Sequence, residues 1–182
     1  MKKKIIITGG LGYIGTELCK LYSGTSWHHE IIVVDNRFIS ERVNQIRNWN
    51  MEFIQGDILD KNLIKEHFKD ADVVHHLAGV TDVPRTKSET SNKKDELIKE
   101  VGVKGTQNIL DVISNKCKII FPSTHVVYEG IDEVKKDIQE DEKTKPVLSY
   151  SISKAINEDQ LKKSGKNYVI LRLGSVYGYS TD

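Results

Sequence analysis

Tyr150 and Lys154 lie four residues apart in the stretch SYSISK, residues 149–154, and this spacing places two side chains on one face of a helix. A phenol has an ordinary pKa of about 10 and is a poor base at neutral pH. An ammonium group one turn away stabilises the phenolate and lowers that pKa. The pair is therefore interpreted as a proton-transfer device, although a surface tyrosine and lysine at this spacing are also common.

Two hydroxyl residues, Ser123 and Thr124, follow a strand predicted over residues 118–122. Active sites of parallel α/β proteins lie at the carboxyl ends of strands, so one of these hydroxyls could bridge a substrate oxygen and the phenol. The alternative is a hydroxyl that caps the backbone at the strand end.

The stretch TGGLGYIG, residues 8–15, follows a predicted strand and opens a predicted helix. Glycines in such a turn permit a positive φ and let a diphosphate approach the backbone, where the free N–H groups of the helix bind it. Two spacings are present, Gly9-Gly12-Gly15 and Gly10-Gly12-Gly15. The turn predicts a dinucleotide site, with a helix start that binds no ligand as the alternative.

Asp35 ends the stretch EIIVVD, twenty residues after Gly15, and is predicted to accept hydrogen bonds from both ribose hydroxyls of an adenosine. Its charge would repel a 2′-phosphate, which favours NAD over NADP, although Arg37 nearby is a residue type that accepts such a phosphate. Asp57, in GDI, is placed to meet the adenine amino group, or else serves as a turn or N-cap residue.

These residues must be positioned by an alternation of short β-branched runs and longer amphipathic segments. The pattern predicts an α/β fold, a Rossmann-like, doubly wound parallel sheet with helices on both faces. Strands are predicted at residues 3–8, 30–35, 51–55, 72–76, 118–122 and 168–173, and helices at 12–22, 61–68, 93–114 and 150–163. Two polar segments interrupt the pattern: residues 81–92, which follow a strand end, and residues 129–145, interpreted as a solvated surface loop.

Composition excludes several classes of function. Lys plus Arg number 27 and Asp plus Glu number 26, so a net charge of +1 gives no reason to expect nucleic acid or an anionic membrane as partner. No stretch approaches the roughly 18 apolar residues of a membrane span. Cys19 and Cys117 are expected to be buried thiols in a reducing cytoplasm. The adjacent histidine pairs 28–29 and 75–76 point apart, so no metal site is expected.

Eight motifs in order resemble the extended short-chain dehydrogenase/reductase family, the NAD-dependent nucleotide-sugar epimerases and dehydratases. They are TGGLGYIG, VVD, GDI, HHLAG (75–79), VGVKGTQNIL (101–110), PSTHVVYEG (122–130), YSISK and LRLGSVYG (171–178). In this family Gly9, Gly12 and Gly15 form the phosphate-binding turn, and Gly10 is an additional glycine.

The resemblance implies roles for individual residues. Tyr150 would be the catalytic acid/base, Lys154 its partner, and Thr124 the catalytic hydroxyl, with NAD accepting a hydride from a sugar carbon. The implied cofactor-binding residues are Gly9, Gly12, Tyr13, Ile14, Gly15, Asp35, Asn36, Asp57, Ile58, Leu77, Ala78, Gly79, Tyr150 and Lys154. A nucleotide-sugar would be the substrate, and two helices per subunit would form a homodimer.

Departures from the family pattern narrow the reaction. Dehydratases carry an acidic pair after the threonine and decarboxylases an acid at the second of these positions, where this chain has His125 and Val126. Epimerisation or 4-keto reduction therefore remains. Gly102 replaces the usual asparagine, Gly79 an alanine, and Glu129 a glycine.

Length is the last departure, because the family continues after LRLGSVYG into a substrate domain of about another domain's size. We expect residues 1–182 to be a truncated NAD(P)-binding Rossmann domain without that substrate domain. Two functions follow: part of a cytoplasmic nucleotide-sugar epimerase or reductase, or a stand-alone NAD-binding or interaction module without turnover.

Overall fold

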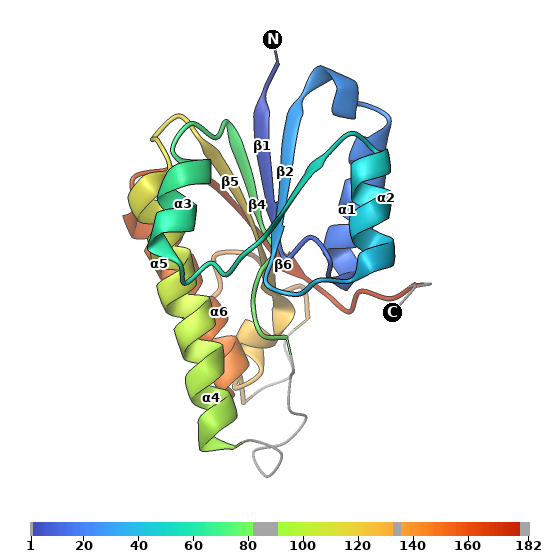
Figure 1. The fold of residues 1–182 in the computed structure, drawn as a ribbon. Coiled ribbons are helices and arrows are strands. Elements are labelled where there is room, and N and C mark those ends of the chain that lie inside the picture. Colours follow the sequence, from blue (N-terminus) through green and yellow to red (C-terminus); the bar gives the residue numbers. More distant parts are fainter. Residues whose placement is uncertain (1, 82–90, 133–135, 179–182) are drawn as a thin grey trace.

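The computed structural model describes residues 2–81, 91–132 and 136–178, in which strands and helices alternate (Figure 1). The strands of this part are β1 (Lys4–Thr8), β2 (Glu30–Asp35), β3 (Glu52–Gln55), β4 (Val73–His76), β5 (Lys118–Thr124) and β6 (Asn167–Leu173). The longer helices are α1 (Tyr13–Ser23), α2 (Ser40–Asn48), α3 (Lys61–Phe68), α4 (Asn92–Lys99), α5 (Gly105–Val112) and α6 (Ser149–Lys163). Short helical turns are η1 (Ser26–His28), the π-helical η3 (Glu100–Lys104) and η4 (His125–Tyr128).

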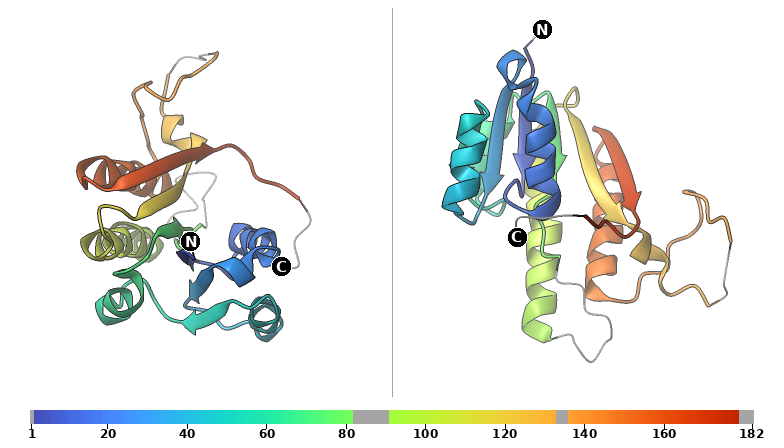
Figure 2. Two further views of the ribbon diagram at one scale, coloured as in Figure 1. Left: turned by 90° about the horizontal axis from the view of Figure 1, so that it is seen from above. Right: turned by 90° about the vertical axis from the view of Figure 1, so that its right-hand side faces the viewer.

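The strands form one sheet in the order β3-β2-β1-β4-β5-β6, and every neighbouring pair is parallel. Helices α1 and α2 lie on one face, and α3, α5 and α6 lie on the other (Figures 1 and 2). The predicted doubly wound, Rossmann-like sheet is therefore confirmed. The order reverses between β1 and β4, and ligands of such sheets bind at the carboxyl ends of the strands beside that reversal.

Strand β1 shows how one run of isoleucines serves two cores. Ile6 packs into a cluster with residues of α3, α5 and α6, while Ile5 and Ile7 pack into a second cluster with residues of α1 and α2. Successive side chains of a strand point to opposite faces, so an uninterrupted apolar run suits a sheet that is covered on both sides.

Helix α2 was not predicted from the sequence. Its segment, SERVNQIRN, carries Val43 and Ile46, three residues apart, and both are buried against the sheet. Two apolar residues among polar ones are a weak periodic signal in the sequence, and packing against the sheet supplies most of the stability of so short a helix.

The predicted long helix over residues 93–114 is interrupted. It is built as α4, the π-helical turn η3 and α5, and it ends at Val112. In the part of the chain that the structure describes, no helix combines the length and the apolar character needed to cross a bilayer.

Candidate active site

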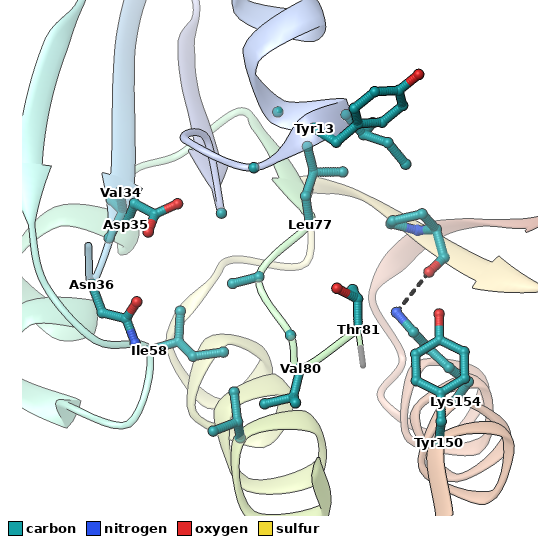
Figure 3. A pocket seen from close by; sticks show the side chains of 18 of the residues that line it. Tyr13, Val34, Asp35, Asn36, Ile58, Leu77, Val80, Thr81, Tyr150 and Lys154 are labelled. Carbon is teal, nitrogen blue, oxygen red and sulfur yellow. Dashed lines mark hydrogen bonds between the residues drawn. The ribbon is translucent and has the colours of Figure 1, made fainter. Parts of the chain in front are cut away.

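A cavity of about 720 Å³ lies at the carboxyl ends of the central strands, within the roughly 300–1,000 Å³ typical of ligand pockets. Every residue that the sequence assigned to the site lines this cavity. Asp35 and Asn36 lie on one side of it, and Tyr150 and Lys154 lie on the other (Figure 3). Lining residues that the sequence did not assign to it include Val34, Gly56, Leu59, Val80, Leu97, Val101, Leu173 and Val176. Of these, Leu59, Val80 and Leu97 lie outside the quoted motifs, and the other five lie within motifs but were given no role in the site.

The glycine turn is shaped so that side chains are excluded. Gly9 has a φ of 67°, and a Cβ there would lie 2.8 Å from the backbone nitrogen of Ala78. A Cβ on Gly15 would lie 2.3 Å from the carbonyl oxygen of Gly9. Helix α1 begins directly after Gly12 and receives no side-chain cap. Its first N–H groups and its positive end therefore suit a diphosphate, which is the fit expected for a dinucleotide.

Asp35 is buried and braces this turn. One carboxylate oxygen accepts the N–H of Leu11 at 3.0 Å, and the other accepts the N–H of Arg37 at 3.0 Å and its Nε at 3.3 Å. A carboxylate has about four acceptor sites, so this arrangement leaves about one for a ribose hydroxyl. The guanidinium of Arg37 is about half exposed and also lines the cavity.

Asp57 performs the turn role that was its alternative reading. One of its carboxylate oxygens accepts the N–H of Leu59 at 2.9 Å, and the other accepts the side-chain amide of Asn36 at 3.2 Å. The contact joins the ends of β2 and β3 on the cavity wall. Both residues thus face the place where the adenosine half of a dinucleotide is expected.

Lys154 lies at the opposite end of the cavity and is partly buried. Its Nζ donates to the carbonyl oxygen of Pro122 at 2.9 Å and lies 4.5 Å from the centroid of the Phe121 ring. Burial disfavours the charged amine and lowers the pKa of Lys154 to about 8.

Tyr150 does not have the lowered pKa expected from its lysine neighbour, and that expectation is wrong for this structure. Lys154 Nζ lies 5.8 Å from the centroid of the Tyr150 ring and is directed at Pro122. Burial penalises the phenolate and raises the pKa of Tyr150 above its ordinary value. The phenol is therefore protonated at neutral pH in this arrangement.

The two hydroxyls at the end of β5 have different tasks. Ser123 donates to the Glu158 carboxylate at 2.6 Å, so its proton is directed away from the cavity. Thr124 Oγ accepts the N–H of Val126 at 3.2 Å, the capping role that was its alternative reading, and this bond leaves its O–H as a donor. Thr124 is therefore the hydroxyl that suits a substrate oxygen.

Glu158 forms a buried ion pair beneath the site. Arg172 Nη2 lies 2.6 Å from one carboxylate oxygen, and Arg172 Nε lies 2.9 Å from the other. Burial opposes the charge of Glu158, but the hydrogen bonds from Arg172 and Ser123 outweigh it and hold the pKa of Glu158 below its ordinary value. The pair joins α6 to β5 and β6, which carry the site residues.

The adjacent histidines of β4 face opposite sides of the sheet, as predicted. His75 lies 2.8 Å from the hydroxyl of Tyr22, on the α1 side. His76 lies between the hydroxyls of Thr8 and Thr106, at 3.0 and 2.9 Å. Burial and the charge of Lys154 lower the pKa of His76 to about 3, so this ring is neutral. Through its two hydroxyl partners it links β4 to β1 and to α5. In the described ranges no three His, Cys, Asp or Glu residues gather as a metal site.

Gly102, which stands where the family has an asparagine, lies in the π-helical turn η3 beside α6. A Cβ at this position would lie 2.3 Å from the hydroxyl of Ser153. Asn157 donates to the carbonyl oxygen of Gly102 at 3.0 Å, and Gln160 donates to that of Val103 at 3.1 Å. The glycine thus allows α6 to approach closely, and side chains of α6 satisfy carbonyls of the π turn.

The polar segment 81–92 is described in part. Thr81 lines the cavity beside Val80 (Figure 3). Residues 82–90 lie outside the described residues.

Comparison with known proteins agrees with this geometry. The model of the NAD dependent epimerase/dehydratase family matches residues 5–182. The chain is 33% identical to the UDP-N-acetyl-alpha-D-glucosaminuronate decarboxylase of Bacillus cytotoxicus over 98% of its own length and 56% of that protein. It is 30% identical to the dTDP-D-glucose 4,6-dehydratase of Dictyostelium discoideum, over 97% of its own length and 44% of that protein.

Among solved structures, the UDP-glucuronic acid 4-epimerase of Bacillus cereus in complex with NAD is similar to the chain with a TM-score of 0.76 and 25% identity. The likeness covers 96% of this chain and 57% of the epimerase. The chain therefore spans about half the length of these relatives.

Proposed function

Because the chain belongs to the NAD dependent epimerase/dehydratase family, we propose that it binds NAD and serves an NAD-dependent nucleotide-sugar epimerase or 4-keto reductase. The observation that carries this proposal is a single cavity lined at one end by the glycine turn and at the other by Thr124, Tyr150 and Lys154. A dinucleotide-binding turn and a proton-transfer pair therefore face the same cavity (Figure 3).

The residues present suit NAD in three places. The N–H groups after Gly12 and Gly15 would hold the diphosphate, and Asp35, Asn36 and Asp57 would hold the adenosine. The ammonium of Lys154 and the phenol of Tyr150 would bond the nicotinamide ribose. The chemistry that NAD supplies when bound is acceptance of a hydride from a sugar carbon.

The chain's own residues move the proton. Tyr150 would take the proton of the sugar hydroxyl during oxidation and return it during reduction of the ketone. Its raised pKa suits the acid role directly, whereas the base role needs the Lys154 ammonium or another positive charge to be brought closer to the phenol. Thr124 would donate its O–H to the substrate oxygen and so orient it toward Tyr150.

The choice of epimerisation or reduction rests on two side chains. The relatives include a decarboxylase and a dehydratase at 33% and 30% identity, so overall identity does not separate these reactions. His125 and Val126 follow Thr124 and offer no carboxylate for elimination or decarboxylation. We propose a UDP- or dTDP-linked sugar as substrate, because proteins similar to this chain carry such substrates in their names.

We also propose a homodimer and a cytoplasmic location. Ile156 on α6 is an exposed apolar residue outside the cavity lining, on a helix that packs against α4, which suits a helix-to-helix interface. Cys19 and Cys117 are buried free thiols, which suits a reducing compartment.

The decisive experiment uses the polypeptide at the length found in its source cells. It is incubated with NAD and a panel of UDP- and dTDP-sugars, and NADH absorbance and sugar epimers are measured. Oxidation or epimerisation of one sugar, lowered roughly 10²- to 10⁴-fold by Tyr150→Phe and unchanged by Tyr168→Phe on β6, would support the proposal. Binding of NADH without turnover of any sugar would favour the NAD-binding module instead.

A further inference from the structure

The helix that carries Tyr150 and Lys154 begins without a cap of its own. Helix α6 starts at Ser149, and its N-cap residue, Leu148, has no side chain that accepts a hydrogen bond. The first N–H groups of a helix have no partner within the helix, and they need an acceptor from elsewhere. Helix α3 differs, because its N-cap residue Asp60 accepts from Asn62 and Leu63.

Glu129, which lies 18 to 22 residues earlier in the chain, supplies an acceptor for the N-cap residue and for the residue before it. Its Oε1 accepts the N–H of Val147 at 2.8 Å and the N–H of Leu148 at 2.7 Å. The same oxygen accepts the hydroxyl of Ser151, which is fully buried next to Tyr150. A carboxylate at a helix N-terminus also interacts favourably with the helix dipole. Glu129 itself is exposed, as expected for a solvated loop, but its carboxylate is held by these three donors.

Glu129 is tied just as closely to Thr124. The turn η4 begins directly after Thr124 and ends at Tyr128, so Glu129 is the next residue. The backbones on the two sides also pair: the N–H of Gly130 donates to Lys145 at 2.9 Å, and the N–H of Lys145 donates to Val127 at 2.9 Å. The segment that follows Thr124 and the segment that leads into α6 thus form one connected unit.

We propose that Glu129 is a positioning residue that sets Tyr150 relative to Thr124, and this role rests on the proposed function of those two residues. The three bonds to one carboxylate oxygen fix the first turn of α6 against the end of β5. Without them the backbone before α6 gains freedom, and water reaches the ring of Tyr150.

The test compares Glu129→Ala and Glu129→Gln with Asp141→Asn, which removes the same charge from an exposed position of the same loop. The first measurement is hydrogen exchange of the Ile152 amide, which donates to Leu148 at 2.9 Å. The Ile64 amide in α3, which donates to Asp60 at 3.1 Å, is the reference within the same molecule. The second measurement is the pKa of the Tyr150 phenol, obtained by subtracting the titration of a Tyr150→Phe counterpart.

We expect Glu129→Ala to raise exchange at Ile152 about tenfold without changing Ile64, the effect of losing one helix cap. The pKa of Tyr150 falls toward its ordinary value, because burial is what raises it. Glu129→Gln keeps an acceptor oxygen and gives a smaller change in both quantities, and it remains informative if Glu129→Ala does not fold. Asp141→Asn leaves both unchanged.

Unchanged exchange at Ile152 in both Glu129 variants would overturn the proposal. Faster exchange with an unmoved Tyr150 pKa would also overturn it, since Glu129 would then cap the helix without positioning the phenol. Neither measurement needs a sugar substrate. A chain that oxidises no nucleotide-sugar would therefore refute the proposed function and leave this test of Glu129 intact.

Discussion

The side-chain nitrogen of Lys154 on α6 lies 2.9 Å from the backbone carbonyl oxygen of Pro122 on β5, the contact drawn as a dashed line in Figure 3. The bond carries the amine away from water and places it over the Phe121 ring. As a result the lysine next to the candidate acid/base has a pKa of about 8, well below the ordinary value of 10.5. Its charge is therefore titrated close to neutral pH.

Lys154→Met should change the pH dependence of stability on the alkaline side. Between pH 8 and 10.5 the unfolded chain keeps the lysine proton while the folded chain has lost it, so the contribution of Lys154 to stability rises with pH. The free energy of unfolding of the chain relative to Lys154→Met should rise by about 1 kcal/mol per pH unit in this window. Urea denaturation from pH 7 to 10 measures it, with the exposed Lys163→Met as control. Parallel curves would contradict the assignment.

Gly15→Ala should disrupt the phosphate turn. The added methyl group would lie 2.3 Å from the carbonyl oxygen of Gly9, which forces the turn open. We expect the free energy of unfolding to fall by about 1–3 kcal/mol, which is the usual cost of overpacking. We also expect the affinity for NADH to fall more than tenfold, because the distorted turn no longer fits the diphosphate. NADH fluorescence titration and thermal unfolding measure the two quantities.

The matched control is Gly24→Ala at the end of α1. Its Cβ would meet nothing within 4 Å, and its φ of −69° suits alanine. This substitution should preserve NADH binding and leave stability unchanged or raise it by about 0.4–1 kcal/mol. Equal effects of the two substitutions would show that the turn does not bind the cofactor.

Arg37→Ala should sharpen the preference for NADH over NADPH. The Arg37 guanidinium lines the cavity half exposed beside Asp35, so it is placed to offset the repulsion between that carboxylate and a 2′-phosphate. Removing the guanidinium should weaken the binding of NADPH roughly tenfold, which is the size of one charge-assisted hydrogen bond. The affinity for NADH should change little. Parallel titrations of both nucleotides decide this, with the exposed Arg47→Ala as control. A similar loss for both nucleotides would mean that Arg37 only supports Asp35.

His76→Gln should flatten the acid limb of the stability profile. The pKa of His76 is about 3 in the folded chain against an ordinary 6.5. Between these values the unfolded chain binds a proton that the folded chain rejects, so the stability is present above pH 6.5 and is lost as the pH falls. Between pH 6.5 and pH 4 the free energy of unfolding of the unchanged chain should fall by about 3 kcal/mol more than that of His76→Gln. Urea denaturation at each pH measures this, and a difference that stays constant would contradict it. The exposed His28→Gln should behave like the unchanged chain.

Much of the fold was predictable because burial on both faces of a parallel sheet leaves a direct trace in the sequence. The run of isoleucines in β1 and the stretch EIIVVD in β2 could be assigned as buried strands without any knowledge of their neighbours. Helix α2 had no comparable trace, since two apolar residues mark it. The π turn η3 was equally hidden, because it depends on side chains of α6 that bond its carbonyls.

By itself, the sequence determined that the glycine turn, Asp35, Tyr150 and Lys154 share one cavity, although it did not identify several of the apolar residues that complete the wall. Tyr150 and Lys154 share a helix face, and the glycine turn and Asp35 sit at strand ends, so local periodicity and the topology of a parallel sheet were enough to bring them together. These are statements about position, and position follows from backbone geometry.

Only the tertiary structure decided what each group is paired with. It raised the pKa of Tyr150 where the spacing of Tyr150 and Lys154 alone predicted a fall, and it assigned the proton of Ser123 to Glu158. It also brought Glu129 to the start of a helix that begins 20 residues later. Hydrogen-bond partners and burial come from segments far apart in the chain, and desolvation outweighs the effect of a neighbour in sequence, so no local pattern contains them.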